Sequence, residues 1–114
     1  MATRSRLRAK LSNGKFLKPI YCHWDGYPDH MLPTLNGHYN TDEKVAELMA
    51  LGNLSALHDR VKPDEGEPHS FDKPAENVTI AYHRDRGEKL EFWRYKQEYN
   101  YLYQNGEWKV ESKW

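Results

Sequence analysis

The sequence predicts an α+β fold, in which an N-terminal and a C-terminal hairpin build an antiparallel sheet with one or two helices packed on one face. Two Asn-Gly pairs, one toward each end of the chain, indicate the hairpins, because Asn-Gly supplies the positive φ angles that a type I′ turn requires. Apolar residues at helical spacing in the middle of the chain indicate the helices. A length of 114 residues suits a single domain over residues 1–114.

The first hairpin turns at residues 13–14. A two-residue turn there pairs Leu11 with Phe16 and Leu7 with Ile20. Strand side chains alternate between faces, so the hairpin has one apolar and one cationic face. The apolar face is expected to hold Leu7, Ala9, Leu11, Phe16, Ile20 and Cys22. The opposite face is expected to hold Arg4, Arg6, Arg8 and Lys10.

The second hairpin turns at residues 105–106, which pairs Tyr103 with Trp108 and Tyr101 with Val110. Cross-strand aromatic pairs of this kind contribute roughly 0.2–1 kcal/mol each. Two further strands are predicted at residues 78–83 and 89–95, with Gly87 in the turn between them.

Helical signal lies between the hairpins. Thr41 is a suitable N-cap, and Val45, Leu48 and Met49 follow at helical spacing before Gly52, a natural residue for the helix end. A shorter helix is expected to begin at Pro33, since proline is tolerated at a first helical position. Residues 62–74 hold most of the prolines and are predicted to form a surface loop.

Composition excludes several classes of function. The 17 basic and 17 acidic side chains cancel, so bulk charge gives no support for a general polyanion-binding protein, although local patches stay open. One cysteine excludes an internal disulfide and a cysteine-rich zinc site, and the six histidines lack metal-ligand spacing. We therefore expect no metal and no cofactor. We also expect no membrane span, because no apolar run approaches ~20 residues. No signal peptide is visible, which favours the cytosol.

The most informative segment is residues 20–29, Ile-Tyr-Cys-His-Trp-Asp-Gly-Tyr-Pro-Asp, at the exit of a predicted strand. Polar and aromatic residues at such a position usually mark a binding site. His23 and Asp25 are the minimum for an oriented general base, but the segment lacks a nucleophile or a metal. The alternative is an Asp-Gly turn with His23 and Trp24 packed beneath it. Ligand binding is favoured over catalysis.

The arginines suggest a second function. Arg4, Arg6 and Arg8 together could hold phosphates while Tyr21 or Trp24 stacks a base, which indicates a nucleotide-binding protein with or without slow hydrolysis. The alternative is a solvated sheet face whose charges discourage aggregation.

A turn with two arginines beside Gly87 is the last candidate, either as an anion clamp or as a solvated turn. This turn and the segment at residues 20–29 both follow predicted strands, so we expect them to meet around one concave surface at an end of the sheet. Its expected members are Tyr21, His23, Trp24, Asp25, Tyr27, Arg84 and Arg86.

The chain also resembles a family of small accessory proteins of tailed bacteriophages. Residues 1–5 and the Tyr-Cys-His-Trp-Asp-Gly-Tyr-Pro run at residues 21–28 carry the resemblance, which extends through residues 51–55 and 69–72 to about Glu88. It implies a protein in the cytoplasm of the infected cell that binds and interferes with a host or antiviral-defence protein. A small nucleotide is the alternative partner, and homodimerisation through an open sheet edge is compatible with the predicted fold.

Overall fold

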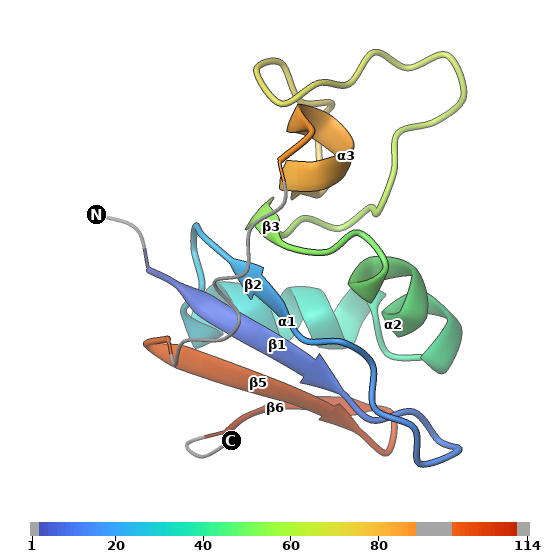
Figure 1. The fold of residues 1–114 in the computed structure, drawn as a ribbon, viewed down its shortest axis with the longest axis vertical. Helices are drawn as coiled ribbons and strands as arrows, with labels where there is room; N and C mark the ends of the chain where they lie inside the picture. Colours follow the sequence, from blue (N-terminus) through green and yellow to red (C-terminus); the bar gives the residue numbers. More distant parts are fainter. Residues whose placement is uncertain (1–2, 89–96, 112–114) are drawn as a thin grey trace.

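The computed structural model describes residues 3–88 and 97–111. A six-stranded sheet carries helices α1 and α2 on one face, and α3 lies at one edge (Figure 1). Across the sheet the strand order is β4-β3-β2-β1-β5-β6. Along the chain the elements are β1 (Ser5–Ala9), β2 (Ile20–Cys22), α1 (Pro28–His38), α2 (Asp42–Met49), β3 (Leu54–Ala56), β4 (Ile80–Ala81), α3 (Tyr82–Arg86), β5 (Tyr99–Gln104) and β6 (Glu107–Val110).

The sheet is mixed, so the expectation of a purely antiparallel sheet is wrong, while the α+β class is confirmed. β1 pairs antiparallel with β2 and parallel with β5, and β2 pairs parallel with β3. Parallel neighbours need a crossover connection of a dozen or more residues. α1 and α2 provide that connection between β2 and β3. Local hairpin signals in the sequence do not reveal such a parallel pairing.

The C-terminal hairpin has the predicted register. Tyr103 pairs with Trp108 and Tyr101 with Val110. Asn105 and Gly106 both have positive φ, 56° and 77°, as a type I′ turn requires. The side chains of Tyr101, Tyr103 and Trp108 are buried in the core.

The N-terminal hairpin keeps only part of its predicted register. Leu7 pairs with Ile20 as expected, but Lys10 rather than Leu11 lies opposite Phe16. The two pairings differ by one residue, and a shift of one residue turns a strand side chain to the other face. The expectation that Phe16 joins the apolar face is therefore wrong, since its side chain is 53% exposed.

Helix α2 is confirmed, and α1 begins earlier than predicted. The Thr41 side chain accepts a hydrogen bond from the backbone N–H of Lys44 at 3.2 Å, which caps α2. α1 starts at Pro28, so Pro33 lies inside the helix rather than at its start. Pro28 takes the first helical position because its fixed φ suits that position and it needs no N–H partner there.

Only Ile80–Ala81 of the strand predicted at residues 78–83 is a strand, because the chain turns into α3 at Tyr82. Gly87 ends this helix with a φ of 78°, rather than turning a hairpin. The strand predicted at residues 89–95 lies outside the described residues. Residues 62–74 contain no helix or strand.

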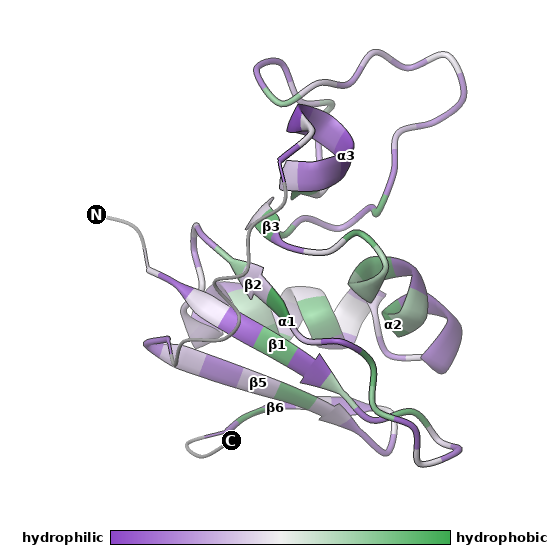
Figure 2. Cartoon of the chain, in the orientation of Figure 1, coloured by the Kyte–Doolittle hydropathy of each residue, from purple (hydrophilic) through white to green (hydrophobic). Residues whose placement is uncertain are grey.

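One hydrophobic core lies between the sheet and the two longer helices. α3 and the long loop before it are largely hydrophilic (Figure 2). None of the helices in the described residues is both long and apolar enough to span a bilayer. The core contains Leu7, Ala9, Ile20, Cys22, Met31, Leu35, Tyr39, Val45, Leu48, Met49, Leu54, Leu57, Val61, Ala81, Tyr101, Tyr103 and Trp108.

Candidate functional site

Residues 23–27, called here the strand-exit loop, leave the end of β2 with a tightly fixed backbone. The N–H of His23 donates to the carbonyl of Leu54 at 3.0 Å, and that of Trp24 donates to Ser55 at 2.9 Å. The N–H of Gly26 donates to the carbonyl of Thr3 at 2.8 Å. The loop is thus bonded to β3 on one side and to the segment before β1 on the other.

Gly26 is the point of closest packing in this loop. A Cβ atom at this position would lie 2.7 Å from the carbonyl oxygen of Thr3 and 2.8 Å from Cβ and Oγ of Ser5. From within the core, the Tyr101 hydroxyl donates to the carbonyl of Gly26 at 2.6 Å. Asp25 has a φ of 53°, a conformation that aspartate tolerates better than most residues. The path of the loop is therefore set by its neighbours.

Two aromatic side chains stand out from this fixed backbone. Trp24 is 46% exposed and Tyr27 is 40% exposed. The His23 ring meets the Trp24 ring edge to face, with centroids 4.8 Å apart. The loop thus presents two partly exposed aromatic side chains on a fixed backbone.

Tyr21 and His23 form a hydrogen-bonded pair on the sheet face away from the helices. The Tyr21 hydroxyl lies 2.7 Å from Nδ1 of His23. Burial raises the pKa of Tyr21, and burial together with the charge of Arg4 lowers the pKa of His23. Both shifts favour the uncharged forms of the phenol and the imidazole, and the tautomer of His23 sets which of the two donates. In the described residues no hydrogen bond or ion pair joins His23 to Asp25, the two residues of the catalytic alternative.

The predicted arginine stripe is divided among separate partners. Arg6 is buried and its Nε donates to the side chain of Asn100. Arg8 pairs with Glu111, with Nε 2.9 Å from Oε2. Arg4 is exposed and close enough to Tyr21 and His23 to influence their pKa values. Tyr21 itself is buried, so it presents no open ring face for a base.

Arg84 and Arg86 belong to a different group of contacts. Arg84 donates to the carbonyl of Thr79 at 2.6 Å and pairs with Asp85 at 2.8 Å. Arg86 pairs with Glu88 at 2.9 Å, and its Cζ lies 4.9 Å from the centroid of the Phe71 ring. Through these contacts α3 holds the loop that precedes β4 in place.

The strand directions relate this group to the strand-exit loop. β3 runs parallel to β2, and β4 runs antiparallel to β3. The chain therefore leaves β2 at Cys22 and β4 at Ala81 in opposite directions along the sheet. Cys22 and Ala81 nevertheless both lie opposite Leu54, on either side of β3. The expectation that the two segments meet around one concave surface stays a prediction.

A buried His–Asp pair does exist, at a place the sequence did not indicate. His69 Nε2 lies 3.1 Å from Asp85 Oδ2, and both side chains are only 4% exposed. His69 Nδ1 accepts the N–H of Ala75 at 2.9 Å, so Nε2 carries the proton and donates to Asp85. Burial alone would raise the pKa of Asp85, but hydrogen bonds from Arg84, Ala81 and His69 outweigh it and lower the pKa. Both ring nitrogens of His69 are hydrogen-bonded within the fold, so this pair stabilises the structure. The sequence did not indicate it because no local pattern links two residues that are 16 positions apart.

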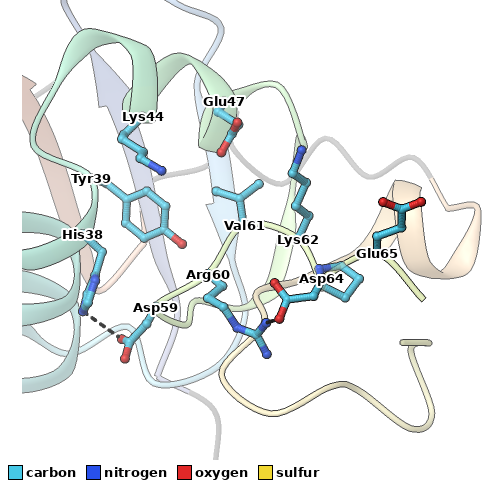
Figure 3. Close-up of a pocket in the computed structure, with 11 residues that line it drawn as sticks. His38, Tyr39, Lys44, Glu47, Asp59, Arg60, Val61, Lys62, Asp64 and Glu65 are labelled. Carbon is cyan, nitrogen blue, oxygen red and sulfur yellow. Dashed lines mark ion pairs between the residues drawn. The ribbon is translucent and has the colours of Figure 1, made fainter. Parts of the chain in front are cut away.

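A pocket of about 360 Å³ lies between α2, the end of α1 and the loop after β3 (Figure 3). Its charges are mixed and partly paired. His38 pairs with Asp59 at 3.4 Å, and Arg60 lies 3.5 Å from Asp64 and 3.0 Å from Glu67. The lining residues are His38, Tyr39, Lys44, Glu47, Asp59, Arg60, Val61, Lys62, Pro63, Asp64 and Glu65.

Neither a metal-binding cluster nor a reactive thiol is found in residues 3–88 and 97–111. No group of three or more potential metal ligands comes together there. Cys22 is fully buried, and burial raises its pKa to about 12, so the thiol stays protonated.

Comparisons of the chain with protein-family models, with curated proteins and with solved structures found no match. The resemblance to tailed-phage accessory proteins therefore stays a prediction from the sequence.

Proposed function

We propose that the chain is a binding protein that uses its strand-exit loop to contact a partner protein. One observation carries this proposal: Trp24 and Tyr27 are exposed on a backbone that three inter-segment hydrogen bonds hold in place. Trp, Tyr and Arg dominate the energetics of protein interfaces, and Arg4 lies close to the same loop. A preset loop also loses less conformational entropy on binding than a mobile one.

The sequence resemblance suggests the kind of partner. A small phage accessory protein of this type would act in the cytoplasm of the infected cell by occupying a host or antiviral-defence protein. Small-nucleotide binding is the weaker proposal, because Tyr21 is buried and both Arg6 and Arg8 have partners within the fold.

The test uses three tagged forms of the full chain as baits in a nuclease-treated lysate of a susceptible bacterial host. They are the wild type, Trp24→Ala/Tyr27→Ala, and Phe16→Ala. Phe16 is another exposed aromatic residue, on the hairpin between β1 and β2 and away from the strand-exit loop, and so serves as the matched control. We expect the wild type and Phe16→Ala to capture the same stoichiometric protein, and the double variant to lose it.

The captured protein is then purified and its dissociation constant is measured for each form. Truncating two hot-spot residues, each worth about 2 kcal/mol, should weaken binding by roughly 30-fold or more even if they are not additive. Equal affinity of the double variant, or the absence of any stoichiometric partner, would contradict the proposal. Unchanged melting temperatures of the variants show that the fold is intact.

A further inference from the structure

The basic side chains are unevenly distributed along the chain. Basic and acidic side chains are equal in number, but Asp25 is the first acid. Charge asymmetry of this kind suggests contact with a polyanion even when the net charge is zero. The basic residues that precede Asp25 are Arg4, Arg6, Arg8, Lys10, Lys15 and Lys18.

Several of these cations gather at the end of the hairpin between β1 and β2. Phe16 lies opposite Lys10 there, and its ring is 53% exposed. Arg8 Cζ and Lys10 Nζ are each 5.8 Å from the centroid of this ring. Lys15, next to Phe16, is exposed as well. We call Lys10, Lys15 and Phe16 the hairpin-tip patch.

The two lysines of the patch form no ion pair with any residue in the described ranges. Arg8 is different, since Glu111 neutralises it. Asp42 is the acid that contacts the hairpin, and both of its carboxylate oxygens already accept hydrogen bonds. The backbone N–H of Ser12 donates to one at 3.0 Å, and the Tyr103 hydroxyl donates to the other at 3.1 Å. Within residues 3–88 and 97–111, therefore, no acidic side chain pairs with either lysine.

The patch is separate from the strand-exit loop. β2 starts at Ile20, after the hairpin, and ends at Cys22, before the strand-exit loop, so the two features lie toward opposite ends of β1 and β2 (Figure 1). A ligand of the patch is therefore independent of the partner proposed for Trp24 and Tyr27.

We propose that the hairpin-tip patch binds single-stranded nucleic acid. An exposed aromatic ring flanked by cations is the arrangement on which a base stacks while its phosphates are neutralised. An acidic protein surface is the competing partner. It is disfavoured because lysine is depleted at protein interfaces, whereas lysine charge is what a phosphate backbone selects. The inference goes beyond the proposed protein-binding function and does not depend on it.

The experiment measures fluorescence anisotropy of a labelled oligothymidine of about 12 nucleotides at rising salt, starting near 50 mM. Two phosphate contacts should give a slope of log Kobs against log salt of about −1.4, and each lysine removed should reduce its magnitude by about 0.7. Lys10→Gln/Lys15→Gln should therefore lose almost all salt dependence. Lys44→Gln/Lys62→Gln, which removes equal charge from the mixed-charge pocket, is the matched control and should bind as the wild type does.

Variants at Phe16 test the stacking component. Phe16→Ala should weaken binding about fivefold or more, and Phe16→Trp should keep it. No binding at low salt, equal losses in the control variant, or unchanged affinity of Phe16→Ala would each overturn the proposal. Competition by polyglutamate as effective as that by unlabelled oligothymidine would also overturn it, and would assign the patch to an acidic protein instead.

Discussion

Replacing Gly26 by alanine tests whether the strand-exit loop is held in place by its neighbours. The added Cβ would lie 2.7 Å from the backbone oxygen of Thr3 and 2.8 Å from Ser5, which is fully buried. A backbone carbonyl and a buried serine have little room to move, so the loop itself must shift. That shift strains both hydrogen bonds of Gly26, one to Thr3 and one from Tyr101.

The expected loss of stability follows from these contacts. Overpacking costs about 1–3 kcal/mol, and each weakened hydrogen bond contributes up to about 0.5–1.5 kcal/mol. We therefore expect a loss of about 2–4 kcal/mol. At roughly 4 °C per kcal/mol for a chain of this size, the melting temperature should fall by about 8–16 °C.

Thermal and urea unfolding of Gly26→Ala, followed by circular dichroism, provides the measurement. Gly37→Ala is the matched control, because the position is in α1 and, apart from its chain neighbours and the helix's own backbone, no atom lies within 4 Å of the added Cβ. Alanine is the better helix former, so this variant should be neutral or up to about 1 kcal/mol more stable. If Gly26→Ala melts together with the wild type, the tight packing of the loop is refuted.

Three further predictions concern other contacts. Tyr101→Phe removes the buried hydroxyl that donates to Gly26 and should lower the unfolding free energy by about 1–2 kcal/mol in urea titrations; an unchanged value would contradict the role of this bond. His69→Ala leaves the buried Asp85 carboxylate and the N–H of Ala75 without their imidazole partner. It should lower the unfolding free energy by about 2–3 kcal/mol and speed proteolysis within residues 62–77. Proteolysis at the wild-type rate would show that the loop does not depend on His69. Burial and Arg4 lower the pKa of His23, and burial and His30 lower that of His58, from 6.5. As the pH falls, the unfolded chain therefore takes up protons before the folded chain does. The stability that depends on these two histidines is complete above pH 6.5 and is lost as the pH drops through their folded pKa values. The variant His23→Gln/His58→Gln should therefore show a shallower pH dependence of the melting temperature.

Elements defined by local chemistry could be predicted from the sequence. The C-terminal hairpin follows from the φ preferences of Asn105 and Gly106, and α2 follows from its Thr41 cap and its apolar spacing. These signals lie within a few residues of the structure that they determine. The strand-exit loop was likewise identified from its unusual residues, although its function stays a proposal.

Features that depend on distant residues could not be predicted. The parallel pairing of β1 with β5 and the ties of Arg6 and Arg8 to Asn100 and Glu111 join the two ends of the chain. The pairing of His69 with Asp85 likewise depends on a long loop that folds back against α3. The exposure of Phe16 follows from a one-residue shift in the hairpin that alternation alone does not reveal.

Amide hydrogen exchange of the free chain, followed residue by residue by NMR, tests most directly whether the strand-exit loop is preformed. The amides of His23, Trp24 and Gly26 each donate to a carbonyl of another segment. We predict that they exchange as slowly as the amides of β1, because opening them requires the loop to separate from β3 and from the segment before β1, and both β3 and β1 are interior strands of the sheet. Exchange at the rate of an unstructured peptide would contradict the account, since Trp24 and Tyr27 would then be carried by a mobile loop.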